Sequence, residues 1–108
     1  GLIASMLTKI PGASDGFHAG FVTYHNAIKH SVLAVDKTSL DTEGAVSETV
    51  VRQMALGALD KSGADYAIAV SGIAGPDGGT NDKPVGTVWL AWGSHEALHT
   101  RCLCWPVE

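Results

Sequence analysis

Two strand-like runs meet in residues 70–89, VSGIAGPDGGTNDKPVGTVW. Residues 64–70, which lead into this segment, are short and apolar and follow a glycine, as is typical of a buried strand. Residues 86–92, which leave it, are rich in β-branched and aromatic side chains and predict a second strand. Residues 70–89 together hold five glycines and two prolines. We expect the rest of the chain to hold this glycine loop in place.

The glycines of the loop permit positive φ angles and let bare backbone N–H groups approach a ligand. Neighbouring N–H groups of this kind form anion-binding nests. The alternative is that the glycines only let the chain cross from one strand to the next, and their spacing does not separate the two interpretations. Neither a G-x-G-x-x-G nor a Walker spacing is present, and no helical pattern follows directly, which argues against a dinucleotide-binding fold. The glycines concerned are Gly72, Gly75, Gly78 and Gly79.

Apolar periodicity predicts three helices elsewhere in the chain. Residues 1–10 place apolar side chains at helical spacing and stop at a Pro-Gly pair, which predicts a helix with one buried face. Residues 27–33 predict a short helix, with Asn26 as its N-cap. The clearest helix lies between the N-cap Ser47 and Gly63, just past its end.

The remaining segments complete the expected fold. Residues 17–24 predict another strand, residues 36–44 a polar connection, and residues 87–92 and 97–107 a β-hairpin around the turn 93–96. This order of elements permits parallel pairing through helical crossovers together with one antiparallel hairpin. The predicted fold is a three-layer α/β/α domain with a mixed, mostly parallel sheet.

Composition limits the function classes. The chain has 108 residues, 45% of them hydrophobic, which suffices for one domain with its own core. Its formal net charge is −4 and its seven lysines and arginines are scattered, so we expect no nucleic-acid partner. The sequence has no apolar run near the length of a membrane span and no charged-then-apolar leader. We therefore expect a cytoplasmic protein without a membrane partner.

The two cysteines, Cys102 and Cys104, would share one face of a strand. A disulfide between such close neighbours would be strained, and the sequence has no framework of cysteine spacings. Both are interpreted as reduced, half-buried residues, with a redox or metal pair as the alternative.

Metal chemistry has little support in the sequence. His95 and His99 have a helical spacing but fall in a predicted turn and strand. We therefore predict neither a metal nor a cofactor. A serine activated by a neutral lysine is the chemistry that remains, because burial or a nearby charge can lower the pKa of an amine. Lys29 lies in the first turn of a predicted helix, where the dipole disfavours a cation, but on its own it is interpreted as a solvated lysine.

Several blocks of the chain together resemble the CinA C-terminal domain family, whose characterised members are PncC-type nicotinamide mononucleotide deamidases. The glycine loop carries the most specific match, and the other blocks follow in the family's order. The resemblance covers essentially the whole chain as a single, partial domain, residues 1–108. The matching blocks are 71–76, 78–80 and 83–88 in the loop, and elsewhere 1–4, 11–14, 20–24 with Asn26 and Lys29, and 44–48.

The resemblance implies the site residues. In the family, the nucleophile is the serine of a Glu-Ser-Cys-Thr-Gly turn, which would precede the residue matching Gly1, and an arginine of the site would follow Glu108. The assisting tyrosine and lysine correspond to Tyr24 and Lys29. This chain departs from the family at Ala34: the family has a Leu-Gly-Val-like triplet, and the matching residues here are Leu33, Ala34 and Val35. The expected substrate-binding residues are Gly72, Ala74, Gly75, Gly78, Gly79 and Thr80.

The function implied is hydrolysis of the amide of nicotinamide mononucleotide to the nicotinate form, with release of ammonia. The alternative is a non-catalytic nucleotide-binding or regulatory module in a two-domain CinA protein. A third possibility is that the loop serves packing alone. We expect a small-molecule nucleotide as substrate, a homo-oligomer, and a second domain fused in some parents. The segment alone is expected to be inactive, because the nucleophile of the family lies outside it.

Overall fold

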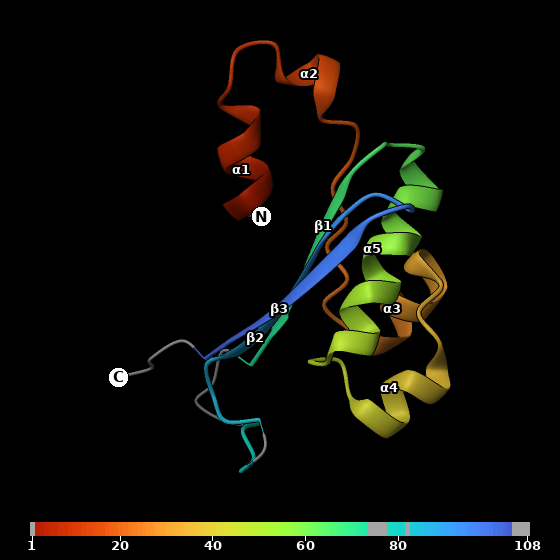
Figure 1. Cartoon of the computed structure of the whole chain (residues 1–108), viewed down its shortest axis with the longest axis vertical. Coiled ribbons are helices and arrows are strands. Elements are labelled where there is room, and N and C mark those ends of the chain that lie inside the picture. Colours follow the sequence, from red (N-terminus) through yellow and green to blue (C-terminus); the bar gives the residue numbers. More distant parts are fainter. Residues whose placement is uncertain (1, 74–77, 82, 105–108) are drawn as a thin grey trace.

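The computed structural model describes residues 2–73, 78–81 and 83–104 (Figure 1). The chain is of the α/β type, and three of its helices lie together on one side of a small sheet. Two short helices stand at one end of the molecule, next to each other. In chain order the elements are α1 (Leu2–Thr8), α2 (Ala13–Gly16), α3 (Asn26–Leu33), α4 (Lys37–Glu43), α5 (Glu48–Ser62), β1 (Ala67–Gly72), β2 (Thr87–Gly93) and β3 (Leu98–Cys104).

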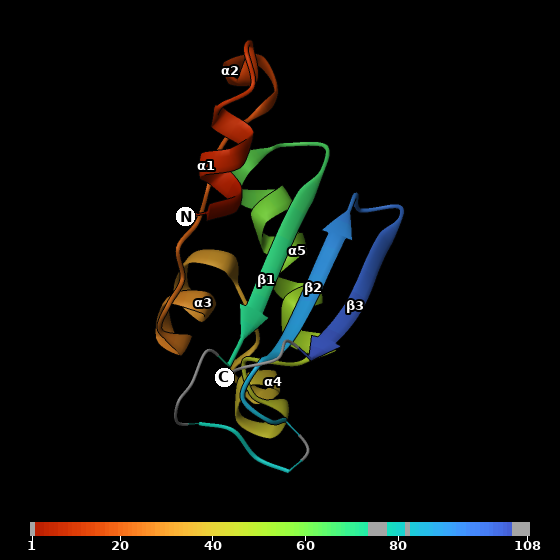
Figure 2. The same ribbon diagram turned by 90° about the vertical axis from the view of Figure 1, so that its left-hand side faces the viewer.

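The sheet has the order β1-β2-β3, and both pairings are antiparallel (Figure 2). Gly72 of β1 pairs with Val88 of β2, so the glycine loop connects the two strands of a hairpin. The expected hairpin of β2 and β3 is confirmed, but the expectation of a mostly parallel sheet is wrong for the described strands. The reason is that the structure describes no helix between β1 and β2, and a parallel pair requires a long crossover.

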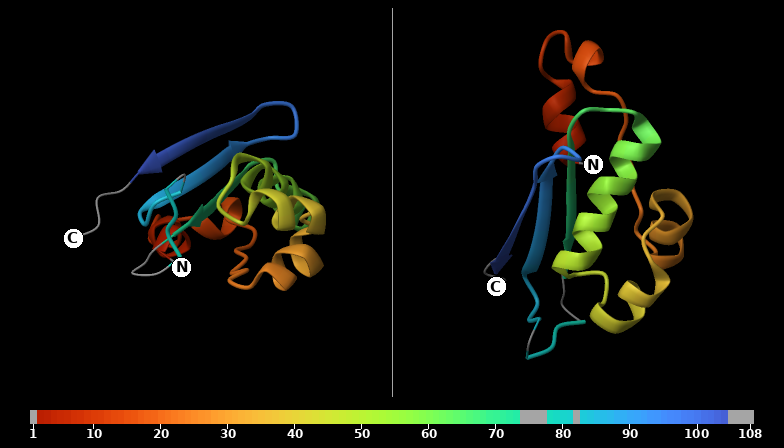
Figure 3. Two further views of the ribbon diagram at one scale, coloured as in Figure 1. Left: turned by 90° about the horizontal axis from the view of Figure 1, so that it is seen from below. Right: turned by 45° about the vertical axis from the view of Figure 1, so that its right-hand side comes forward.

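Three of the described helices pack on one face of the sheet, whereas the expected α/β/α fold would have helices on both faces. Helix α5 lies along one face of the sheet, and α3 and α4 pack on α5 from the far side (Figure 3). Residues 17–24, predicted as a strand, belong to no strand and pair with none of the three described strands. None of the described helices is long and apolar enough to cross a membrane.

The core lies between α5 and the inner face of the sheet. Small residues Ala69 and Ala91 face α5 and are buried, which lets the helix approach the strands closely. Each fully buried valine or leucine contributes about 1.5–3 kcal/mol relative to exposure. From α5 the core residues are Val50, Val51, Met54, Ala55 and Leu59, joined by Leu33, Val35 and Leu40.

The predicted caps of α5 are confirmed. The Ser47 hydroxyl accepts a hydrogen bond from the N–H of Val50 at 3.3 Å. Gly63 has φ 70°, and its N–H donates to the carbonyl of Leu59. These contacts satisfy backbone groups that a helix leaves unpaired at its ends.

Two details of the helical layer differ from expectation. The N-cap of α3 is His25, whose ring nitrogen accepts from the N–H of Ala27, rather than Asn26. The polar connection at 36–44 contains the helix α4, capped by Asp36 and anchored by the buried Leu40. A single buried apolar side chain gives too little periodicity to be recognised in a sequence.

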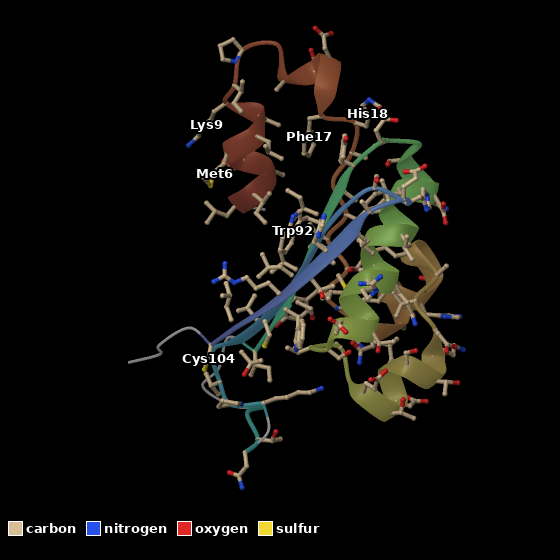
Figure 4. The ribbon with its side chains drawn as sticks, in the orientation of Figure 1. Met6, Lys9, Phe17, His18, Trp92 and Cys104 are labelled. Carbon is tan, nitrogen blue, oxygen red and sulfur yellow. The ribbon has the colours of Figure 1, made fainter. Side chains whose placement is uncertain are left out.

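The outer face of the sheet is apolar and exposed. Ile68, Val70 and Trp92 project from it, and Figure 4 shows Trp92 on the side of the sheet away from α5. Helix α1 was expected to bury one face, but Leu2 and Met6 are 77% and 60% exposed, and Met6 projects away from the sheet (Figure 4). No described element covers either surface closely enough to bury it.

The strand β3 lies at an edge of the sheet, where α5 gives little cover. Cys102 and Cys104 pair with Trp89 and Thr87 and so share the inner face, as predicted. Both are free thiols, but they are exposed rather than half-buried.

Candidate active site

Lys29 is a buried lysine, with only 6% of its surface exposed. Its ammonium nitrogen lies 2.5 Å from the carbonyl oxygen of Thr23 and 3.4 Å from that of Tyr24. Within the described part of the chain, no carboxylate lies within 4.0 Å of it. The expectation of a solvated lysine, drawn from the residue alone, is therefore wrong.

Burial lowers the pKa of the Lys29 amine below its ordinary value of 10.5, because desolvation penalises the charged form. The two backbone carbonyls accept hydrogen bonds from the amine in either protonation state. A lysine of this kind can lose its proton more easily than a surface lysine and can serve as a base.

The backbone of α3 fixes the position of Lys29. Its N–H donates to the carbonyl of His25 at 3.1 Å, and its carbonyl accepts the N–H of Val35 at 3.2 Å. Between Lys29 and Val35 the chain leaves the helix through Ala34, which has φ 57° and ψ 30°. Ala34 is the one non-glycine residue with positive φ among those described. The turn that ends α3 is therefore strained at the position where the resembled family has glycine.

Tyr24 lies next to Lys29 through its backbone only. The tyrosine side chain is 95% exposed, so its hydroxyl is in solvent while its carbonyl faces the amine. The backbone of Tyr24 thus contacts the amine of Lys29, but the structure shows no contact between the tyrosine hydroxyl and that amine.

The described glycines of the loop differ in their backbone conformation and surroundings. Gly78 has φ 95°, and among the described residues an added Cβ would meet Ile73 alone, at 3.8 Å. At Gly79 a Cβ would lie 2.7 Å from the nitrogen of Val85, so this glycine permits a close crossing of two backbone segments. Gly72 belongs to β1 and is not among the glycines with positive φ. Ala74 and Gly75 lie outside the described residues.

Hydrogen bonds close the base of this loop. The N–H of Ile73 donates to the carbonyl oxygen of Thr87 at 2.9 Å, and the N–H of Gly86 donates to the carbonyl oxygen of Ile73 at 2.7 Å. The buried Thr87 donates its hydroxyl to the carbonyl of Pro84 at 2.6 Å. Thr80, a predicted binding residue, donates its N–H to the carbonyl of Lys83 at 2.8 Å. The loop is therefore an ordered extension of the hairpin at both of its described ends.

The loop and the start of α3 lie at the same end of the molecule (Figure 2). A pocket of about 180 Å³ adjoins this part of α3, lined by Asn26, Ala27, His30, Lys37, Leu40 and Asp41. Nothing in the sequence pointed to it, because α4, which supplies half of its lining, was not predicted.

A second pocket, of about 450 Å³, lies at the other end of the sheet. Trp92 and His99 stack beside it, with ring centroids 5.8 Å apart. The Nε2 of His95 lies 3.0 Å from a carboxylate oxygen of Asp60, so His95 is not paired with His99. The part of the chain that the structure describes contains no cluster of three metal-ligating side chains. The pocket is lined by Tyr66, Ala67, Ile68, Trp92, Gly93, Ser94, Ala97 and His99.

Comparisons with known proteins agree on one family. The sequence profile of the CinA C-terminal domain matches residues 1–106. A CinA-like protein of Colwellia psychrerythraea is 58% identical over the whole chain, which spans 25% of that protein. The nicotinamide-nucleotide amidohydrolase PncC of Enterobacter agglomerans is 56% identical over 89% of the chain, which corresponds to 58% of that enzyme.

Solved structures give the same result for the fold. The crystal structure of the competence/damage inducible protein CihA from Agrobacterium tumefaciens superposes with a TM-score of 0.93 and 46% identity. The match covers 98% of this chain and 65% of that structure. The chain thus spans less than two thirds of these relatives, and by its sequence and fold it belongs to the CinA C-terminal domain family.

Proposed function

We propose that this chain supplies the base and the nucleotide-binding loop of an amidohydrolase that acts on nicotinamide mononucleotide. The observation that carries the proposal is the buried Lys29, whose amine has a lowered pKa and no carboxylate partner among the described residues. The similarity to proteins named nicotinamide-nucleotide amidohydrolase supports the choice of substrate.

The proposed reaction requires that the Lys29 amine is neutral before the chemical step, so that it can accept a proton. Lys29 accepts the proton of a serine hydroxyl as the serine oxygen attacks the carbon of the substrate amide. The protonated lysine then gives this proton to the departing nitrogen, and ammonia leaves as the tetrahedral intermediate collapses to an ester. Water hydrolyses the ester with Lys29 again acting as base, which yields nicotinate mononucleotide and restores the serine. The serine is the one that the family resemblance places before the residue matching Gly1.

The glycine loop binds the phosphate of the nucleotide in this proposal. Gly78 and Gly79 have no side chain that could keep an anion from their backbone N–H groups, which are the groups we assign to the phosphate. The phenol of Tyr24 is free to contact the substrate, because its side chain is exposed to solvent. Its contribution is a hydrogen bond to the reacting groups.

The test measures ammonia release from nicotinamide mononucleotide by the product of the complete open reading frame that contains this chain. Lys29→Met keeps the length of the side chain and removes the amine. We expect its activity to fall by about 10²–10⁴-fold, the range typical of a lost general base. Lys61→Met is the matched control, because Lys61 is an exposed lysine of α5.

Circular dichroism establishes that both variants fold. A folded Lys29→Met protein with near-normal turnover would contradict the assignment of the base. A wild-type protein that binds the nucleotide without releasing ammonia would instead favour the non-catalytic nucleotide-binding module.

A further inference from the structure

We propose that Lys83 is a positioning residue that fixes the glycine loop by binding the C-terminal end of α4. Its effect on turnover rests on the proposed function, whereas its effect on the loop can be measured without any substrate. The loop and α4 lie at the same end of the molecule (Figures 1 and 2).

The contact joins two segments that are far apart in sequence. The Nζ of Lys83 donates a hydrogen bond to the carbonyl of Glu43, the last residue of α4. A Cβ at Gly44, the next residue, would lie 3.4 Å from the same nitrogen. The last carbonyls of a helix lack partners within the helix and carry partial negative charge, so a lysine there is favourable. Lys83 therefore acts as a C-terminal cap supplied from a distant loop.

The backbone of Lys83 transmits this anchor to the predicted binding residues. Its N–H donates to the hydroxyl of Thr80 at 3.0 Å, and its carbonyl accepts the N–H of Thr80 at 2.8 Å. The following residue, Pro84, accepts hydrogen bonds from both the N–H and the hydroxyl of Thr87, at 3.0 and 2.6 Å. Thr80 is therefore bound directly to the backbone of the residue whose side chain holds α4.

Lys83 is the link between the loop and the helical layer. Among the loop residues that the structure describes, it alone makes a hydrogen bond outside the loop and its two strands. Without this bond the loop is held by the base of the hairpin and can occupy other positions. A ligand that requires one position then binds more weakly, in proportion to the fraction of protein that still has it.

The experiment compares Lys83→Met, Lys83→Arg and the exposed control Lys61→Met in the product of the complete open reading frame. Amide hydrogen exchange without substrate measures how firmly the loop is held. Steady-state kinetics with nicotinamide mononucleotide measure KM and kcat. We expect Lys83→Met to speed exchange in residues 78–86 but not in α5. If the competent fraction falls to about a tenth, KM rises about tenfold while kcat stays the same. Lys83→Arg should bring the loop exchange rate and KM close to the wild-type values, and Lys61→Met should change neither quantity.

Each other result decides against the proposal or its premise. Unchanged exchange in the loop of Lys83→Met would overturn it, as would faster exchange throughout α5, because Lys83 would then support the whole fold. If Lys83→Arg has the same loop exchange and KM as Lys83→Met, a positive charge at residue 83 does not act on the C-terminal end of α4, which would exclude that role. Faster loop exchange in a protein whose wild type releases no ammonia would uphold the anchor and reject the amidohydrolase assignment alone.

Discussion

The Nζ of Lys29 lies 2.5 Å from the carbonyl oxygen of Thr23, six residues earlier in the chain. A carbonyl is a hydrogen-bond acceptor without a charge, so it holds the amine in place without stabilising the ammonium form as a carboxylate would. Burial therefore dominates, and the pKa of Lys29 is lowered. The same arrangement that orients the base also prepares it to accept a proton.

This relationship predicts a pH dependence of catalysis. If Lys29 must be neutral to accept a proton, kcat/KM for nicotinamide mononucleotide should rise with pH and level off, with an inflection below 10.5. Lys29→Arg is the matched variant, because arginine stays protonated at every pH where the protein is folded. We expect it to be inactive throughout. A rising limb that survives in Lys29→Arg would assign the titration to another group.

The stability of the protein should depend on pH for the same reason. Because the pKa of Lys29 is lower in the folded chain than the unfolded value of 10.5, the unfolded chain binds more protons between these two values. The free energy of unfolding should thus rise with pH across this window, relative to Lys29→Met. Urea unfolding of both proteins from neutral pH to 10.5 measures this difference. A difference that does not change with pH would show that Lys29 is not desolvated.

Ala34→Gly should stabilise the fold. Ala34 has φ 57°, and a left-handed conformation costs a residue with a Cβ about 1–2 kcal/mol. The gain is partly offset, because glycine is more flexible in the unfolded chain by about 0.5–1 kcal/mol. We expect a higher Tm. Ala27→Gly, in the first turn of the same helix and without positive φ, should instead lower stability, by at most about 1 kcal/mol. Equal losses in the two variants would contradict the strain at Ala34.

Gly57→Ala should strongly destabilise the helical layer. A Cβ at this position would lie 1.9 Å from the carbonyl oxygen of Leu33, and neither backbone can move aside cheaply. We expect a loss of at least about 1–3 kcal/mol, the usual cost of overpacking. Because Leu33 ends the helix that carries Lys29, turnover should fall as well. Gly16→Ala is the control, since a Cβ there has nothing within 4 Å. Similar unfolding midpoints for the two variants would show that α3 and α5 are not in close contact.

Local signals explain what the sequence could predict about the fold. Helix α5 combines a long apolar periodicity with a serine cap and a terminal glycine, and the structure has all three. The hairpin of β2 and β3 follows from two strand-like runs across a short turn. The antiparallel pairing of β1 with β2 could not be recognised, because a glycine-rich insert of this length is equally compatible with a crossing to a more distant strand.

Tertiary contacts explain what the sequence left open at the site. The burial of Lys29 depends on the carbonyls of Thr23 and Tyr24 folding back over α3, which no periodicity encodes. The exposed apolar face of α1 looked like core, because amphipathicity shows which face prefers burial and not whether a partner covers it. The roles of Gly72, Thr80 and Tyr24 in substrate binding or catalysis stay predictions.

The last prediction separates an anion-binding loop from a simple connection. Gly78 has φ 95°, and an added Cβ would meet the described residues no closer than 3.8 Å, so Gly78→Ala introduces backbone strain of about 1–2 kcal/mol without a steric clash against them. Gly12→Ala is a matched control, because Gly12 has φ 80°, nothing within 4 Å of an added Cβ, and a position between α1 and α2. Both variants should lose similar stability in thermal unfolding.

The two variants should differ in binding. If the N–H groups near Gly78 hold the phosphate, a change in their orientation weakens charge-assisted hydrogen bonds, so KM for nicotinamide mononucleotide should rise in Gly78→Ala alone. Titration with the phosphate-free nucleoside separates the phosphate contact from the rest of the site, because its binding should be the same in both variants. A Gly78→Ala protein with the KM of Gly12→Ala would mean that the loop only connects β1 to β2.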